Sequence, residues 1–186
     1  VYDRKAEVLY PPVTMEEVPL QKEKSETYLT VSRLISHKRV DIAVEACSRM
    51  GRKLIVVGDG PEKAKLQQLG GSSVEFSGRV SDEELKQLYG SARALLFCSE
   101  EDLGLTPVEA QAAGTPVIAY GKGGALETIQ DGVGGLFFEK QNPESLMEAL
   151  KVFESRSWNA AEIRESVRKF DEGQFLMRIQ QIVAET

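Results

Sequence analysis

Short apolar runs, each followed by a helical pattern, recur along most of this chain of 186 residues. The six runs occupy residues 27–32, 53–58, 73–78, 94–98, 116–120 and 134–138. Continuous apolar runs of this length are typical of strands that are buried on both faces, and strands that alternate with helices form a parallel sheet. The sequence therefore predicts an α/β fold: a Rossmann-like, doubly wound parallel sheet of about six strands with helices on both faces, plus further helices at the C-terminal end.

The composition excludes several classes of protein. The length predicts one domain. A net charge of −6 argues against nucleic-acid partners and anionic membrane surfaces, because both bind clusters of Lys and Arg. No apolar run approaches the ~20 residues of a membrane span, and residues 1–13 do not resemble a secretory signal. Cys47 and Cys98 match no zinc or redox spacing, so we expect buried, reduced thiols in a cytoplasmic protein.

Several helix boundaries are marked by local signals. Ser81 and Glu84 have the spacing of a capping box, and Asn142 followed by Pro143 is typical of a helix start. The last helix carries an apolar set made of Phe175, Ile179, Ile182 and Val183. From these signals we expect helices that start near residues 81 and 142. After residue 157 the chain is more polar, and we expect two further helices there.

Ligands of doubly wound sheets bind at the carboxyl ends of the strands, so the loops after the strands are the candidates for chemistry. The loop after the first run concentrates the cations Arg33, Lys38 and Arg39 beside the only histidine, His37. The planar fork of Arg and the point charge of Lys both suit phosphate oxygens. The loop therefore indicates an anion site. A solvated loop without a ligand is the alternative, and we expect His37 to be a surface residue.

Two glycine-rich turns, GDGP at 58–61 and GKGG at 121–124, resemble phosphate loops only weakly. GDGP lacks the third Gly of GxGxxG and the Lys-Ser/Thr of a P-loop, and no GxGxxG follows the first run, which argues against a dinucleotide oxidoreductase. Gly58 and Gly60 allow a sharp turn, and GKGG could offer N–H groups to an anion at a helix start. A tight turn without a ligand is the alternative for both.

The segment EEDLGLTPVE at 100–109 combines an acidic loop with a helix start. Thr106 as N-cap, Pro107 at the first helical position and Glu109 closing a capping box would explain its second half without a ligand. The three acids of residues 100–102 are adjacent in a loop and are not expected to converge on Mg²⁺. The residues alone thus predict a ligand-binding α/β domain with an anion site.

Four longer stretches in order carry a resemblance to a known family: SRLISHKRVDIAVEA, IVVGDGPEKAKLQQL, VEFSGRVSDEELKQLYGSA and EEDLGLTPVEAQAAGTPVIAYGKGGALETIQDGVGGLFF. Over roughly residues 8–155 the chain resembles the donor-binding C-terminal half of GT-B glycosyltransferases of the large retaining family four (glycosyltransferase group 1). The most specific elements are the Glu-x7-Glu pair, Glu101 and Glu109, and the Arg-x4-Lys pair, Arg33 and Lys38.

The resemblance implies roles for these positions. Arg33 and Lys38 would neutralise the diphosphate of a nucleotide-sugar and stabilise the leaving nucleoside diphosphate, a form of electrostatic catalysis. Glu101 would bind hydroxyl groups of the donor sugar, and Glu109 the ribose diol. The catalytic set is therefore Glu101, Arg33 and Lys38. The family is generally metal-independent and the chain has no Asp-x-Asp motif, so neither a metal nor another cofactor is expected.

The remaining implied contacts are made chiefly by main chain. The set of nucleotide-sugar-binding residues, apart from the charged groups above, comprises Gly58, Gly60, Arg79, Val80, Asp102, Leu103, Gly104, Leu105 and Thr106. The loop with Arg79 and Val80 would meet the base, and the two glycines would keep that end of the cleft open. Asp102 and Leu103 stand where the family commonly has Gly-Phe, which leaves the conformation of that loop and the choice of sugar open.

The resemblance also implies an organisation and an activity. Residues 1–18 would be a linker from an N-terminal acceptor-binding domain, residues 19–156 the nucleotide-sugar-binding domain, and residues 157–186 helices that pack back on the other domain. The enzyme would transfer a hexose, with mannose from GDP-mannose preferred over UDP-sugars or other GDP-sugars, to a glycan or lipid-linked acceptor. The full-length enzyme would be cytoplasmic, with peripheral association at the inner face of the membrane. The isolated segment would be inactive, and a stand-alone, non-catalytic nucleotide- or sugar-phosphate-binding module is the alternative.

Overall fold

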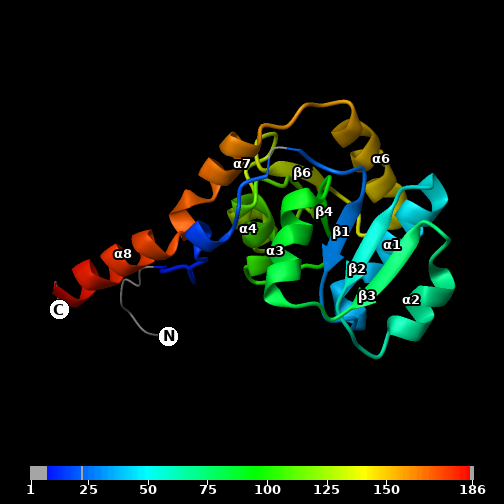
Figure 1. The fold of residues 1–186 in the computed structure, drawn as a ribbon, viewed down its shortest axis with the longest axis horizontal. Coiled ribbons are helices and arrows are strands. Elements are labelled where there is room, and N and C mark those ends of the chain that lie inside the picture. The colour runs from blue at the N-terminus through cyan, green and yellow to red at the C-terminus, as the bar shows by residue number, and fades with distance from the viewer. Residues whose placement is uncertain (1–7, 22, 185–186) are drawn as a thin grey trace.

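The computed structural model describes residues 8–21 and 23–184. Its centre is a parallel sheet of six strands in the order β3-β2-β1-β4-β5-β6 (Figure 1). The strands are β1 (Tyr28–Val31), β2 (Leu54–Val57), β3 (Val74–Gly78), β4 (Leu95–Phe97), β5 (Val117–Tyr120) and β6 (Gly135–Phe138). The order reverses direction between β1 and β4, which makes the sheet doubly wound and confirms the predicted fold class.

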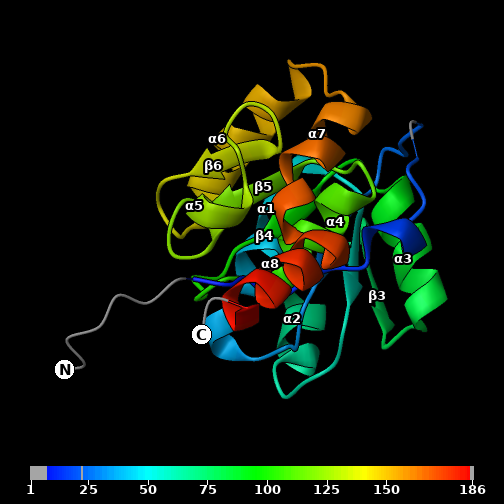
Figure 2. The same ribbon diagram turned by 90° about the vertical axis from the view of Figure 1, so that its left-hand side faces the viewer.

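Helices cover both faces of this sheet (Figures 1 and 2). The α-helices are α1 (Val40–Met50), α2 (Lys63–Leu69), α3 (Asp82–Ser91), α4 (Leu105–Ala112), α5 (Ala125–Thr128), α6 (Pro143–Glu154), α7 (Ala160–Ser166) and α8 (Glu172–Ala184); the 3-10 helices are η1 (Met15–Glu17), η2 (Ser36–Lys38) and η3 (Arg168–Phe170). One buried cluster joins the sheet to α1, α2 and α6, and a second joins it to α3, α4 and α5. In β1, Tyr28 belongs to the first cluster and Leu29 to the second, as the period of two along a strand requires.

Two predicted helix caps are confirmed and one is wrong. The Ser81 side chain accepts a hydrogen bond from the Glu84 backbone N–H at 3.2 Å, and the Asn142 side chain accepts one from Ser145 at 2.9 Å. The predicted N-cap at Thr106 is wrong, because α4 begins at Leu105, two residues before the predicted start, with Gly104 (φ 80°) as its N-cap. Thr106 therefore lies inside the first turn, and Glu109 closes no capping box.

The segment before β1 contacts the segment that follows α6. The Val13 backbone N–H donates to the Phe170 carbonyl at 2.8 Å, and the guanidinium of Arg164 in α7 donates to the carbonyls of Met15 and Val18 at 2.5 and 2.7 Å. Val13, Met15 and Val18 are buried in the same cluster as α4. Residues 13–18 and α7 thus form part of the body of this domain.

Helix α8 differs from the rest, since none of its described residues is buried. It extends away from the sheet in Figure 1 and lies in front of the domain in Figure 2. Elsewhere the predicted buried thiols are confirmed: Cys47 and Cys98 are free and buried, and burial raises the pKa of Cys47 to about 12. Within the described part of the chain, no helix is long and apolar enough to cross a membrane.

Candidate functional site

A cleft of about 620 Å³ lies at the carboxyl ends of β1, β2 and β3, bordered by the start of α4. The predicted site residues that line it come from three loops and the start of α4: Arg33, Gly58, Gly60, Arg79, Val80 and Thr106. This is the edge at which doubly wound sheets bind ligands. The structure therefore gathers these residues around one hollow.

The glycines of the β2–α2 loop are required by a close approach of two backbones. Gly58 has φ +131°, and a Cβ there would lie 1.8 Å from the Ser32 carbonyl oxygen. A Cβ on Gly60 would lie 2.3 Å from the Leu34 carbonyl oxygen. The two loops are also joined by a hydrogen bond from the Leu34 N–H to the Asp59 carbonyl at 3.0 Å. Packing alone thus accounts for both glycines, and it holds the first loop at the rim of the cleft.

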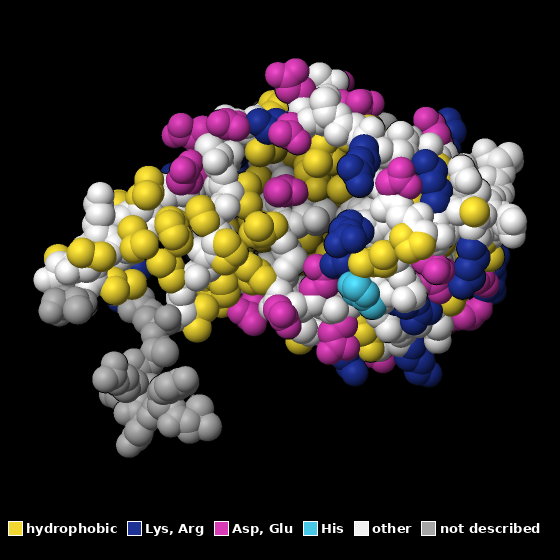
Figure 3. Space-filling view, turned by 90° about the horizontal axis from the view of Figure 1, so that it is seen from below, with side chains coloured by type: hydrophobic (Ala, Val, Ile, Leu, Met, Phe, Trp, Pro, Cys, Tyr) yellow, Lys and Arg dark blue, Asp and Glu magenta, His cyan; other side chains and the backbone are white. Residues whose placement is uncertain are grey.

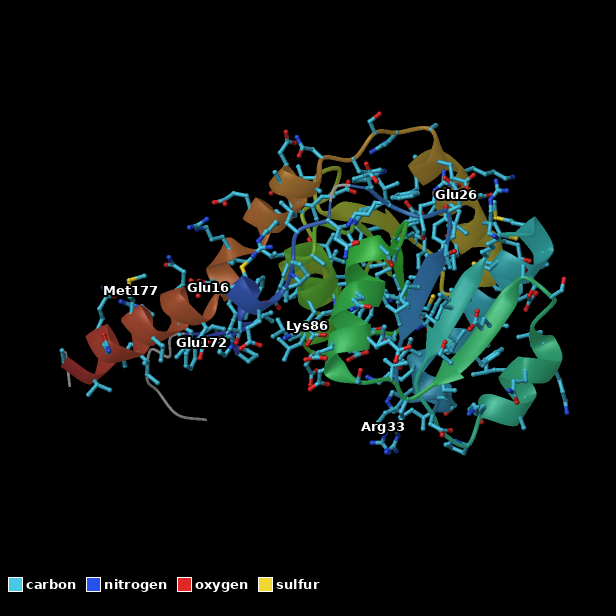
Figure 4. The ribbon with its side chains drawn as sticks, in the orientation of Figure 1. Glu16, Glu26, Arg33, Lys86, Glu172 and Met177 are labelled. Carbon is cyan, nitrogen blue, oxygen red and sulfur yellow. The ribbon has the colours of Figure 1, made fainter. Side chains whose placement is uncertain are left out.

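The three cations of the first loop do not converge. Arg39, at φ 50°, donates to the carboxylate of Asp41 at 3.0 and 3.1 Å and to Gln141 at 3.3 Å, which directs it away from the cleft. Arg33 is exposed and has no ion-pair partner among the described residues. Figure 4 shows Arg33 projecting outward from the loop after β1, and Figure 3 shows Lys and Arg side chains among acidic ones on this side of the molecule.

Lys38 instead contacts the acidic loop that follows β4. Its Nζ lies 2.8 Å from Oε1 of Glu101, and the two side chains are 21% and 23% exposed. The same oxygen accepts a hydrogen bond from the Ser99 hydroxyl at 2.6 Å. Two residues that are 63 positions apart, and that belong to different sequence motifs, therefore form one partly buried ion pair.

The Glu101 loop rests against the GKGG turn. The Gly124 N–H donates to the Glu101 carbonyl at 2.7 Å. Cβ atoms on Gly123 and Gly124 would lie 2.5 Å from the Glu101 carbonyl oxygen and 2.2 Å from Leu103 Cα. Helix α5 is only four residues long. The turn therefore supports the acidic loop rather than presenting its Gly124 N–H to an anion, a role that the sequence analysis did not recognise.

The substitutions at residues 102 and 103 fit this loop without strain. Among the described residues, Arg39 is the non-glycine residue with a positive φ, so Asp102 has an ordinary backbone conformation and an exposed side chain. Leu103 packs against the second buried cluster.

Glu109 projects from α4 toward α3. Its Oε2 accepts a hydrogen bond from the Tyr89 hydroxyl at 2.8 Å. Tyr89 is 2% exposed, and burial together with the neighbouring Glu109 carboxylate raises its pKa well above the ordinary value. Glu109, Tyr89 and Leu105 line a second cavity of about 290 Å³, which meets the first cleft at Leu85. Glu109 is thus held by a tertiary hydrogen bond and not by a cap.

No group of three or more His, Cys, Asp or Glu side chains among the described residues is arranged to hold a metal ion. The acids of residues 100–102 do not converge, because Glu101 points to Lys38 and Asp102 is exposed. The predicted independence from metal is not tested by this geometry and stays a prediction.

Comparison with known proteins places the chain among sugar-transferring enzymes. The family described as "Glycosyl transferases group 1" matches residues 14–170. A GDP-mannose-dependent alpha-mannosyltransferase from Corynebacterium glutamicum is 34% identical over 110 residues, which are 59% of this chain and 26% of the relative. The sulfoquinovosyl transferase SQD2 from Arabidopsis thaliana is 33% identical over 128 residues, 64% of this chain and 25% of the relative.

Solved structures of GT-B glycosyltransferases share the fold. Anabaena HepE in complex with UDP superimposes with a TM-score of 0.83 at 21% identity, over 97% of this chain and 57% of that one. The lipopolysaccharide galactosyltransferase WaaB gives 0.80 at 22% identity, over 97% of this chain and 56% of that one. The chain thus spans between about a quarter and somewhat over half of these proteins. Since the family match covers most of its length, the chain belongs to the group 1 glycosyl transferases.

Proposed function

We propose that this chain is the nucleotide-sugar-binding half of a retaining, metal-independent hexosyltransferase. The observation that carries the proposal is the contact between Lys38 and Glu101 at the carboxyl edge of the sheet. It joins the basic loop after β1 to the acidic loop after β4, so that a phosphate-binding cation and a hydroxyl-binding carboxylate lie side by side. In a nucleotide-sugar the negatively charged diphosphate is bonded directly to the sugar ring, so its phosphate and hydroxyl groups also lie side by side.

The chemistry follows from the two kinds of group. As the bond between the sugar and the diphosphate breaks, negative charge grows on the phosphate oxygens. Arg33 and Lys38 stabilise this charge, and they do so best in a site from which water is partly excluded. Glu101 accepts hydrogen bonds from sugar hydroxyl groups and fixes the position of the ring, while Glu109 binds the ribose at the neighbouring cavity.

Mannose from GDP-mannose is the donor that we propose first. The relative from Corynebacterium glutamicum, which is named as a GDP-mannose-dependent mannosyltransferase, supports this choice. HepE was solved with UDP and with UDP-glucose, but at 20–21% identity it shares the fold alone. A UDP-sugar is therefore the second donor to test.

The exposed helix α8 supports the proposal of a second, acceptor-binding domain. Leu176, Met177 and Val183 are 49%, 52% and 72% exposed. Figure 3 shows hydrophobic side chains gathered at this end of the molecule, and Figure 4 labels Met177 on the helix. The family match ends at residue 170, just before α8. We propose that α8 packs on the other domain and that residues 8–12 lead from it, whereas residues 13–18 and α7 belong to the domain described above.

Without that domain, a glycan or lipid-linked acceptor cannot be held against the donor, so this segment alone should transfer little sugar. We further propose that the whole enzyme works in the cytoplasm, at the inner face of the membrane.

Calorimetric titration with GDP, UDP, ADP and NAD, and then with GDP-mannose and UDP-glucose, tests the proposed function. We expect a nucleoside diphosphate and its sugar derivative to bind and NAD not to bind. Binding of NAD, or of none of these ligands, would contradict the proposal.

A further inference from the structure

Ser99 is a buried hydroxyl at the carboxyl end of β4, and no sequence motif singled it out. Ser99 is only 3% exposed, and its Oγ donates a hydrogen bond to Oε1 of Glu101 at 2.6 Å. Lys38 Nζ contacts the same oxygen at 2.8 Å. Both contacts therefore fall on one oxygen of the carboxylate, and Oε2 of Glu101 has no partner among residues 8–21 and 23–184.

The backbone around Ser99 is held on both sides. The Gln141 side-chain amide donates to the Cys98 carbonyl at 2.9 Å, directly before Ser99. The Gly124 N–H donates to the Glu101 carbonyl at 2.7 Å, two residues after it. Because Ser99 is buried, its hydroxyl needs a protein partner, and that partner is the Glu101 carboxylate. The rotamer of Glu101 is thereby supported by one buried group, Ser99, and one partly buried group, Lys38.

We propose that Ser99 is a positioning residue for the donor sugar. Ser99 and Lys38 occupy Oε1 of Glu101 and leave Oε2 as the oxygen that accepts a hydrogen bond from a hydroxyl group of a hexose. This inference rests on the proposed function, because it assumes that Glu101 meets the sugar. It predicts that Ser99 affects recognition of the sugar and not of the diphosphate, which the cationic loop after β1 binds.

The test compares two pairs of affinities in each of four proteins. Calorimetry measures GDP against GDP-mannose and UDP against UDP-glucose for the unchanged chain, Ser99→Ala, Ser99→Thr and Ser166→Ala. Ser99→Ala removes the side-chain oxygen without adding a heavy atom, and Ser99→Thr keeps the hydroxyl group. Ser166 is a matched control, because it is a half-buried serine whose Oγ donates to the Ile163 carbonyl in its own helix. Thermal unfolding shows that each variant is folded.

We expect Ser99→Ala to weaken binding of the nucleotide-sugar by about 3- to 10-fold, in the range of the net contribution of one typical hydrogen bond, and to leave binding of the diphosphate within about 2-fold. Ser99→Thr should restore the affinity, and Ser166→Ala should change neither ligand. An equal loss for both ligands, or no loss for the sugar derivative, would overturn the role of Ser99 alone. If the unchanged chain bound neither diphosphate, the proposed function would fail, and this inference with it.

Discussion

Lys38 and Glu101 form an ion pair of 2.8 Å across the loops that follow β1 and β4. Partly exposed pairs of this kind contribute only about 0–1 kcal/mol to stability, so the contact does little to explain why the domain folds. Its consequence is local. The cation that we propose for the phosphates pairs here with the carboxylate that we propose for the sugar, so a donor bound at this edge would contact both groups.

Replacing Glu101 by Gln should change the affinities for the diphosphate and for the sugar of the donor in different ways. The amide keeps the shape of the side chain but no longer holds Lys38 by charge. We expect affinity for a nucleoside diphosphate to stay equal or to rise, because Lys38 is released, while the additional affinity given by the attached sugar falls. Calorimetry with GDP and GDP-mannose measures both. A loss of diphosphate affinity as large as the loss for the nucleotide-sugar would contradict the assignment of Glu101.

The hydrogen bond between the buried Tyr89 and the partly buried Glu109 should contribute to stability, and removing it should weaken the fold. Tyr89→Phe leaves the ring in place but deprives Glu109 of its donor at 2.8 Å. We expect a loss of about 1–2 kcal/mol in the free energy of unfolding, measured with urea. Tyr10→Phe is the matched control, since Tyr10 donates to Glu127 at 2.6 Å near the surface. A larger loss for Tyr10→Phe than for Tyr89→Phe would refute the importance of this bond.

Gly58 is expected to be among the least replaceable glycines of the domain. An added Cβ would lie 1.8 Å from the Ser32 carbonyl oxygen at a φ of +131°. Gly51 also has a positive φ, of 63°, but no atom within 4 Å of its Cβ position. We expect Gly58→Ala to cost about 3 kcal/mol or more and Gly51→Ala about 1 kcal/mol, measured by urea unfolding. Equal losses would show that the approach of the two loops is not what requires Gly58.

Lys24 should make stability depend on pH. Its ammonium donates to the Gly90 and Ala113 carbonyls and to Thr115, and burial lowers its pKa from 10.5 to about 8. Between these two values the unfolded chain holds a proton that the folded chain has released, so this residue makes stability rise with pH from about 8 toward 10.5.

We therefore expect the stability of the unchanged protein, relative to Lys24→Met, to be greater at pH 9 than at pH 7. Buried Cys47 has a raised pKa and acts in the opposite direction above about pH 9, and comparison with the variant cancels its effect. Urea unfolding of both proteins at the two pH values measures the difference. A relative stability that is constant or falls would show that Lys24 keeps an ordinary pKa.

The sheet could be predicted from the sequence because its strands are short, continuous apolar runs. Each predicted strand agrees with the observed one to within one residue at either end. The start of α4 could not, because local capping rules favoured Thr106, whereas the backbone of Gly104 begins the helix. Local sequence patterns, namely apolar runs and capping residues, thus predicted most elements but not the start of α4.

The sequence proposes a set of site residues but not the contacts among them. Glu109 was selected by its spacing from Glu101, yet its partner Tyr89 lies on another helix and carries no motif. The packing of Gly123 and Gly124 under the Glu101 loop is likewise a contact between distant segments. Periodicity and spacing do not encode such contacts, since they arise only when the sheet brings the strand ends together.

The central claim is that the cations of the first loop bind a diphosphate. Calorimetry of the unchanged chain, Arg33→Ala and Lys38→Ala with GDP and with guanosine tests it most directly, and Arg156→Ala and Lys151→Ala are matched controls on other parts of the surface. We expect each site variant to weaken binding of GDP by about 10-fold or more, as for the loss of a charge-assisted phosphate contact. Binding of guanosine should weaken by less than about 2-fold. Equal effects on GDP and guanosine, or effects no larger than those of the controls, would contradict the account.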